Sequence, residues 1–88
     1  MQVFYEGHVQ GVGFRWSVQN IAKGFDVTGS VRNLHDGRVE VLATGDDEEV
    51  RAFLDAILQS ELRAHIKKHN ESPLAEPPAF RGFEIRYD

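Results

Sequence analysis

A strand gives way to a helix across the stretch Gly7-His8-Val9-Gln10-Gly11-Val12-Gly13-Phe14-Arg15. Before this stretch, the apolar residues within Gln2–Val9 favour a buried strand. After it, apolar residues recur at helical spacing up to a stop signal at Gly24, namely Phe14, Val18, Ile21 and Ala22. The glycines in between allow backbone angles that other residues resist. The stretch therefore predicts a strand, a tight glycine-rich turn and a helix.

A hairpin is predicted next along the chain. Phe25–Asn33 and Arg38–Ala43 are rich in β-branched residues, which favour strands. They are joined by Leu34-His35-Asp36-Gly37, in which Asp-Gly is a strong hairpin signal.

A second helix and two more strands are expected in the rest of the chain. Asp46 is predicted to cap the helix and Glu49 to complete a capping box, ahead of apolar residues at helical spacing: Val50, Phe53, Leu54, Ile57 and Leu58. The acidic run Asp46–Glu49 at the start of this helix complements the helix dipole. Arg63–Asn70 is a weaker strand prediction, Glu71–Ala79 with its three prolines a loop, and Phe80–Tyr87 a last strand.

This order of elements predicts an α+β fold. The sequence βαββαβ, with one short extra strand, suits a ferredoxin-like sandwich in which both helices lie on one face of an antiparallel sheet. The 88 residues are too few to divide into two lobes, so residues 1–88 are expected to form a single domain.

Composition excludes several classes of protein. Hydrophobic residues make up 41% of the chain and charged residues 27%, as in ordinary globular proteins. The absence of cysteine rules out disulfides, thiolate metal sites and a cysteine nucleophile. No apolar run approaches a membrane span, and no signal peptide opens the chain, so we expect a cytoplasmic protein with no membrane partner. The net charge of -4 argues against nucleic acid as a partner.

The glycine-rich stretch is suited to bind an anion. Three glycines at a strand-to-helix junction can turn backbone N–H groups toward one point, where the helix dipole adds positive potential. Arg15 supplies a planar fork of donors that matches phosphate or carboxylate oxygens. The glycines could alternatively make only a tight turn, with Arg15 a surface residue. Neither the Gly-Lys-Ser/Thr ending of a nucleotide-binding loop nor the third glycine of a dinucleotide fold is present.

Two motifs resemble the signatures of the acylphosphatase family. The first is Gly7-x-Val9-Gln10-Gly11-Val12-Gly13-Phe14-Arg15. The second is Gly29-Ser30-Val31-Arg32-Asn33, three residues, Gly37-x-Val39, five residues, and Gly45. Together they span about half the chain. Ser30 departs from the pattern, because the family usually carries an aromatic residue there, and this bears on local packing more than on catalysis.

The resemblance implies an enzyme that hydrolyses the carboxyl–phosphate bond of acyl phosphates to a carboxylate and inorganic phosphate. It implies no metal, no cofactor and no covalent intermediate. Carried over to this chain, Arg15 holds the phosphoryl oxygens and Asn33 positions the attacking water. The backbone N–H groups of the loop cradle the phosphate, from residues Val9, Gln10, Gly11, Val12 and Gly13. Inorganic phosphate or sulfate should compete with the substrate, and a monomer is expected.

Other interpretations of the chain remain open. One alternative is that the chain is a non-catalytic anion-binding or regulatory module of the same fold, since domains that resemble this family are also attached to larger proteins. An RNA-binding βαββαβ domain would need exposed aromatic residues on its central strands and a basic surface, which the sequence does not offer. Asn33 taken alone would be a turn residue.

Two further sets of residues call for ordinary structural interpretations. His65 and His69 would suit a metal only with further ligands, so solvated histidines are the default. The aromatic residues away from the motifs are predicted to lie in the core or at its edge, namely Trp16, Phe25, Phe53 and Phe83.

Overall fold

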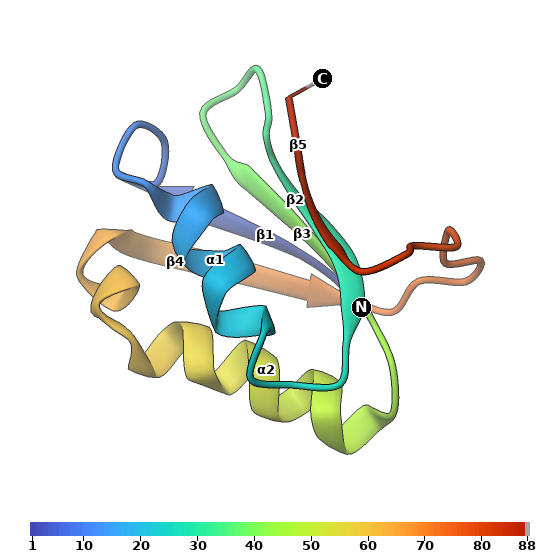
Figure 1. Ribbon diagram of the computed structural model, residues 1–88. Helices are drawn as coiled ribbons and strands as arrows, with labels where there is room; N and C mark the ends of the chain where they lie inside the picture. Colours follow the sequence, from blue (N-terminus) through green and yellow to red (C-terminus); the bar gives the residue numbers. More distant parts are fainter. Residues whose placement is uncertain (88) are drawn as a thin grey trace.

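The structure is a computed structural model that describes residues 1–87. Within these residues two helices, a short 3₁₀ helix and a five-stranded sheet follow one another as β1 (Gln2–Gly7), α1 (Phe14–Ala22), β2 (Thr28–Asn33), β3 (Val39–Thr44), α2 (Asp47–Gln59), η1 (Glu61–His65), β4 (Ile66–Ser72) and β5 (Phe83–Arg86). The strand order is β4-β1-β3-β2-β5. Both long helices lie on the same side of the sheet (Figure 1). The predicted βαββαβ fold is confirmed.

The core lies between the sheet and the two helices. In β1 and β3, alternate residues point toward the helices and are fully buried: Val3 and Tyr5, and Val39, Val41 and Ala43. The helices meet them with residues spaced three or four apart, which are Phe14, Val18 and Ala22 in α1 and Val50, Phe53, Leu54 and Ile57 in α2. Each large side chain buried in this way contributes about 1.5 to 3 kcal/mol. This burial holds α1, and so the loop before it, against the sheet.

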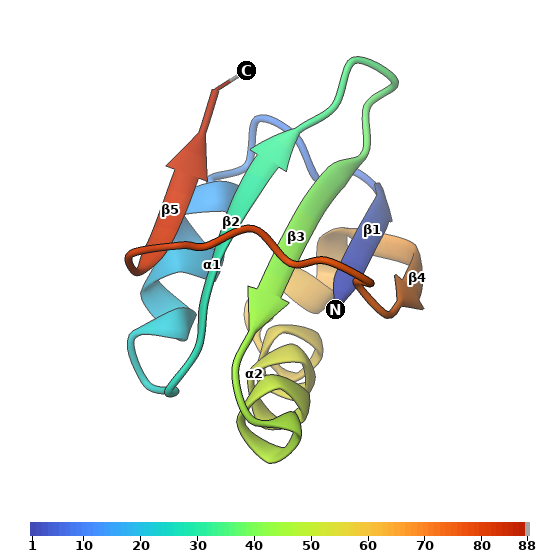
Figure 2. The ribbon, with the colours of Figure 1, turned by 90° about the vertical axis from the view of Figure 1, so that its right-hand side faces the viewer.

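The sheet is mixed, whereas the sequence predicted an antiparallel one. β1 pairs antiparallel with β3 and β4, and β2 pairs antiparallel with β3. β5, however, pairs parallel with β2. After β4 the chain returns across the sheet, on the side away from the helices, before it enters β5 (Figure 2). This crossing brings β5 to the far edge in the same direction as β2, and no local sequence signal encodes that direction.

The N-terminus of α2 differs from the prediction in its capping contacts, because the Asp46 side chain makes no capping hydrogen bond. Asp46 is the N-cap residue, and the first turn is acidic as predicted. The capping box is wrong, because the Glu49 carboxylate accepts a hydrogen bond of 2.7 Å from the backbone N–H of Asp26 instead. Glu49 therefore ties the helix to the segment that leads into β2.

Several element boundaries also differ from the sequence-based ones. β2 begins at Thr28 and not at Phe25, and β1 ends at Gly7. The first part of the predicted strand Arg63–Asn70 belongs to η1, because the Ser60 hydroxyl accepts a hydrogen bond of 3.2 Å from the N–H of the buried Leu62. β4 then extends to Ser72, into the predicted loop, and β5 covers only Phe83–Arg86 of the predicted Phe80–Tyr87.

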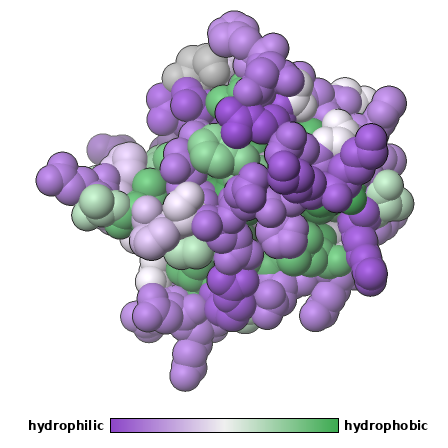
Figure 3. Space-filling model, turned by 180° about the vertical axis from the view of Figure 1, so that it is seen from behind, coloured by the Kyte–Doolittle hydropathy of each residue, from purple (hydrophilic) through white to green (hydrophobic). Residues whose placement is uncertain are grey.

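The surface is mostly hydrophilic where the molecule is seen from behind, with hydrophobic areas between (Figure 3). The edge strand β4 carries exposed charged residues, Lys67 and Lys68. Charged side chains on an edge strand oppose its pairing with another strand. Within the described residues no helix has the length and apolar character to cross a membrane.

The predicted aromatic core is only partly correct. Phe53 is fully buried, and Phe25 and Phe83 are partly buried against the core. The prediction that Trp16 lies in the core or at its edge is wrong, because 63% of the residue is exposed. The core side of α1 is already taken by Phe14 and Val18, and Trp16 projects from another side of the helix.

Candidate active site

The loop between β1 and α1 is anchored at its start and turns through two glycines. The N–H of His8 donates to the carbonyl oxygen of His65 at 2.9 Å, and the Val9 side chain is fully buried. Gly11 and Gly13 have φ of 78° and 76°, in the left-handed region. Left-handed residues alternating with ordinary ones turn successive N–H groups to one side, which forms a concave anion site. The sequence prediction of a glycine-dependent turn is confirmed.

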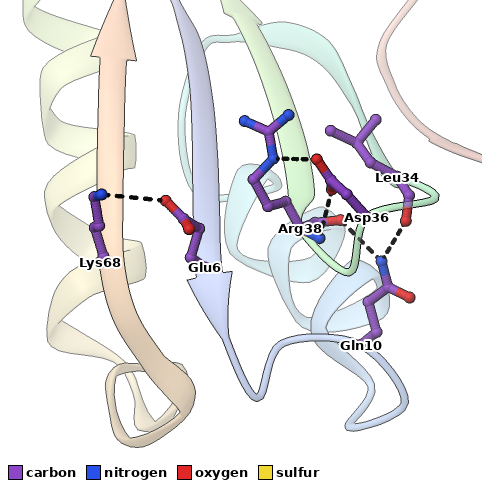
Figure 4. Close-up of polar contacts among 6 residues, drawn as sticks. All are labelled: Glu6, Gln10, Leu34, Asp36, Arg38 and Lys68. Atoms are coloured by element: carbon purple, nitrogen blue, oxygen red, sulfur yellow. Dashed lines mark hydrogen bonds and ion pairs between the residues drawn. The ribbon is translucent and has the colours of Figure 1, made fainter.

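The side chain of Gln10 fastens this loop to the hairpin between β2 and β3. Its Nε2 donates to the carbonyl oxygen of Leu34 at 2.8 Å and to that of Arg38 at 2.9 Å (Figure 4). The hairpin is closed by hydrogen bonds from the N–H of Leu34 to the Arg38 carbonyl oxygen and from the N–H of Gly37 to the Leu34 carbonyl oxygen. The loop and the end of β2, where Asn33 lies, are therefore held in a fixed relation.

The hairpin is further ordered by an ion pair at its tip. The backbone N–H of Arg38 donates to Asp36 Oδ1 at 3.1 Å, and Arg38 Nε donates to Asp36 Oδ2 at 2.8 Å (Figure 4). The first of these bonds is the main cause that lowers the pKa of Asp36. The Arg38 guanidinium also lies over the ring of Phe4, 4.4 Å from its centroid.

Arg15 lies in the first turn of α1 and contacts the C-terminal segment. Its Nη1 is 3.5 Å from the carbonyl oxygen of Arg86, and its guanidinium carbon is 4.7 Å from the centroid of the Tyr87 ring. The first turn of α1 has no acidic residue, and Gly13 caps it without a side chain. The N-terminus of α1 and Arg15 therefore both contribute positive potential at the end of the helix next to the loop.

A hollow of about 190 Å³ brings the predicted site residues together. Its lining includes Val9, Gly11 and Gly13 of the loop, Arg15, and Asn33 at the end of β2. The remaining lining residues are Phe14, Trp16, Ile85 and Tyr87. Gln10 and Val12, which the sequence also assigned to phosphate binding, are not part of the lining, although they belong to the same loop.

Sequence reasoning did not assign four residues of this hollow to the site. Phe14 was expected only as part of the apolar face of the helix. Ile85 and Tyr87 reach the hollow only because β5 pairs with β2, where Ile85 lies opposite Val31. Trp16 was assigned to the core. The available signal for Trp16 was its position in the sequence. It directly follows Arg15, in a helix whose buried face is already filled by other residues.

The histidines do not gather with other ligands. The ring of His69 stacks on Tyr5, with 6.1 Å between centroids, and its Nε2 is 3.8 Å from a Glu71 carboxylate oxygen. His65 lies in η1, where its carbonyl oxygen holds the start of the loop. Among residues 1–87 no three histidine, cysteine, aspartate or glutamate side chains are grouped as metal ligands.

Comparison with known proteins identifies the family to which this arrangement belongs. The family model described as Acylphosphatase matches residues 1–85. The chain belongs to the acylphosphatase family. The acylphosphatase of Lactiplantibacillus plantarum is 43% identical over 79 residues, which cover 90% of this chain and 88% of that protein. The acylphosphatase of Lacticaseibacillus paracasei is 35% identical over 85 residues, which cover 96% of this chain and 91% of that protein.

The fold agrees with a solved structure of the same family. The crystal structure of acylphosphatase from Bacillus subtilis superposes with a TM-score of 0.86 at 31% identity, over 98% of this chain and 96% of that one. The activity of this acylphosphatase-family protein is therefore the hydrolysis of acyl phosphates. Its family places it among enzymes.

Ser30, the departure from the acylphosphatase signature, lies away from the hollow. It is 1% exposed and stands in β2 next to Val31, so the two side chains point to opposite faces of the sheet. Val31 faces the helices, and Ser30 the opposite side. The departure therefore affects packing on the helix-free face and not the lining of the hollow.

Proposed function

We propose that the hollow binds the phosphoryl group of an acyl phosphate and that Arg15, Asn33 and the loop amides carry out its hydrolysis. The observation that carries the proposal is the shared lining, in which Gly11, Gly13, Arg15 and Asn33 meet although they come from distant parts of the chain. The Arg15 guanidinium and the N–H groups of residues 9–13 hold the phosphoryl oxygens. The Asn33 side-chain amide orients a water toward phosphorus.

The reaction needs little beyond this positioning. The water oxygen forms a bond to phosphorus while the bond from phosphorus to the acyl oxygen breaks, and the carboxylate leaves with the electron pair. The Asn33 amide accepts no proton at neutral pH, so a phosphoryl oxygen of the substrate takes the proton from the water. The products are a carboxylate and dihydrogen phosphate. Because the carboxylate is a good leaving group, catalysis comes from orientation and from stabilisation of negative charge on phosphoryl oxygens.

The cradle should also bind free anions. Inorganic phosphate resembles the phosphoryl group of the substrate, and sulfate has the same tetrahedral shape, so both should inhibit competitively. Neither a metal nor a cofactor has a part in the steps above. We also expect the protein to act as a monomer, since the proposed residues all come from one chain. Sedimentation across a range of concentrations tests this expectation.

The test of the phosphate cradle is the replacement of Arg15. Arg15→Ala should lower kcat/KM for acetyl phosphate by at least about 100-fold, which is the usual cost of removing one preorganised donor to the transition state. Binding of inorganic phosphate, measured by calorimetry, should weaken in parallel because the same guanidinium holds both ligands. Arg63→Ala removes an exposed arginine of η1 and should change neither quantity. A folded Arg15→Ala variant that still binds phosphate with full affinity would remove Arg15 from the cradle.

A further inference from the structure

Two large hydrophobic side chains are strongly exposed among the described residues, and both lie at the same hollow. Trp16 is 63% exposed and Tyr87 is 79% exposed. Each is part of the lining that includes Arg15 and Asn33. Exposed apolar surface that gathers in one place marks a site where another molecule binds. The presence of both rings in the lining of the proposed active site therefore points to a ligand that brings an apolar part of its own.

The position of Trp16 follows from the geometry of α1. Phe14, Val18 and Ala22 form the buried side of the helix, and Trp16 is about 200° around the axis from Phe14. Side chains in a helix lean toward its N-terminus, and Trp16 lines the hollow beside the loop. It also lines a neighbouring hollow together with Asn20 and Leu62. Trp16 thus stands beside the phosphate cradle without contributing to the core.

Tyr87 forms the other part of the rim. Its ring lies over the Arg15 guanidinium, at 4.7 Å from the centroid. The segment that carries it is fixed by the pairing of β5 with β2 and by the contact between Arg15 Nη1 and the Arg86 carbonyl oxygen. The ring is therefore held in place although most of it faces solvent.

The lining of the hollow combines polar and apolar groups. Arg15, Asn33 and the glycine-rich backbone supply the polar groups, while the partly exposed Ile85 adds to the apolar surface of the two rings. A volume of about 190 Å³ is small compared with the roughly 300 Å³ or more of sites that enclose drug-sized ligands. A phosphoryl group bound by Arg15 and the loop would occupy much of this volume and leave the rest of its substrate near the opening, where the two exposed rings lie.

We propose that Trp16 and Tyr87 form a subsite for the acyl group and that this protein prefers acyl phosphates with an aromatic or bulky apolar acyl group over acetyl phosphate. The inference rests on the proposed function, because only a phosphoryl group bound at Arg15 places the acyl group at the rim. Planar acyl groups gain most, since ring-to-ring contacts add to the burial of apolar area. The methyl group of acetyl phosphate is too small to cover either ring.

Kinetic selectivity tests the subsite. We expect kcat/KM to be higher for benzoyl phosphate than for acetyl phosphate, and Trp16→Ala to reduce the ratio of the two about fivefold, as expected for the loss of one aromatic contact. Trp16→Phe should keep most of the preference for benzoyl phosphate over acetyl phosphate. Lys23→Ala, which alters an exposed residue at the C-terminal end of α1, should leave this ratio unchanged. An equal fall for both substrates in Trp16→Ala would overturn the subsite.

Binding gives a second readout that does not depend on turnover. Trp16 is the single tryptophan of the chain, so intrinsic fluorescence reports on this position alone. The probes are phenacylphosphonate and acetonylphosphonate, which resemble benzoyl and acetyl phosphate with a methylene in place of the bridging oxygen. Phenacylphosphonate should change the Trp16 emission and bind about fivefold more tightly. Equal affinities with no change in emission would exclude the subsite.

The two proposals fail in different ways. If Arg15→Ala kept its phosphate affinity, the phosphate cradle would be wrong, and the subsite would lose its basis. If Arg15→Ala lost phosphate affinity while Trp16→Ala kept the benzoyl-to-acetyl ratio, the cradle would stand and only the acyl subsite would be wrong.

Discussion

The side-chain amide of Gln10 donates a hydrogen bond of 2.8 Å to the carbonyl oxygen of Leu34. A second bond from the same nitrogen reaches the Arg38 carbonyl oxygen. Through these bonds the loop proposed to hold phosphate and the strand end that carries Asn33 become one rigid unit. In the proposed mechanism, the distance between phosphate and water in the transition state then depends on the Gln10 side chain, although Gln10 is not part of the lining of the hollow.

Loss of this link should impair turnover more than folding. Gln10→Ala removes two partly buried hydrogen bonds and should lower the free energy of unfolding by about 1 to 2 kcal/mol. It should also lower kcat, because Asn33 and the loop are no longer held in register. Gln2→Ala is a matched control, since Gln2 Nε2 donates to Glu40 far from the loop. Equal kcat in the two variants, measured with stability by urea unfolding, would show that the link has no part in positioning.

Asn33 should affect the rate without affecting anion binding. Asn33→Ala should lower kcat by about 100-fold or more, because an unoriented water attacks less often. Competitive inhibition by inorganic phosphate should stay close to wild type, since the amide is assigned to the water. Asn70→Ala in β4 serves as the control. A folded Asn33→Ala enzyme with full turnover would return Asn33 to the role of a turn residue.

The effect of a substitution at Gly11 should depend on the backbone angle that the new residue can adopt and not on its size. A Cβ at this position meets nothing within 4 Å, but φ is 78°. Gly11→Val should therefore cost about 1 to 2 kcal/mol of backbone strain and weaken phosphate inhibition. Gly11→Asn should be tolerated better because asparagine adopts this conformation more readily. If both variants bound phosphate equally well, the left-handed conformation would be irrelevant to the cradle.

Removal of divalent metal should leave the activity intact. The proposed steps use Arg15 and loop amides for the stabilisation of charge that a cation would otherwise supply. Phosphate release from acetyl phosphate after exhaustive chelation should equal that of the untreated protein. Loss of activity that zinc or magnesium restored would contradict the mechanism and would direct attention to His65 and His69.

Stability should fall in acid partly through Glu71. Arg51 donates two hydrogen bonds to its carboxylate, at 2.6 Å and 3.1 Å, and they lower its pKa below the usual 4.5, assisted by the charges of Arg51 and His69. Because the folded state has the lower pKa, this stabilisation is present above pH 4.5 and is lost as pH falls further, through the folded pKa. Glu71→Gln should cost about 1 kcal/mol near neutral pH, since the pair is partly exposed, and the cost should shrink well below that pH.

The control for this prediction is Glu76→Gln, which removes the same charge from an exposed position in the loop before β5. Thermal unfolding of both variants and the wild type across the acid range measures the effect. A difference between wild type and Glu71→Gln that did not depend on pH would mean that the Arg51–Glu71 pair does not govern the acid response.

Local sequence signals predicted most of the fold because they act over a few residues. The Asp36-Gly37 pair predicted the hairpin, and the apolar spacing from Val50 predicted α2. Glu49 shows the limit of such reasoning, because its spacing fits a capping box while its carboxylate bonds to Asp26, across the fold. A competing donor brought close by tertiary packing overrode the local pattern.

The sequence motifs predicted some of the residues that line the hollow, but not the residues that surround them. The glycines, Arg15 and Asn33 lie in recognisable sequence patterns, and they do share one hollow. Ile85 and Tyr87 join them through a parallel strand pairing that no short pattern specifies. The hydrogen bond from Gln10 to Leu34 spans 24 residues. It ends on a backbone carbonyl, which any residue type at position 34 would provide, so the sequence carries no signal for it.

The parallel pairing of β5 with β2 also sets the order in which the molecule can be assembled. Arg15 meets the Arg86 carbonyl oxygen across 71 residues of sequence, among the most distant contacts that the chain makes. Contacts of this kind close late, since much of the chain must be ordered before they form. During synthesis on the ribosome, the segment that covers Arg15 emerges after every other element of the fold. A nascent chain could thus fold its hairpin and its first helix early and still lack one wall of the hollow until residue 87 had left the exit tunnel.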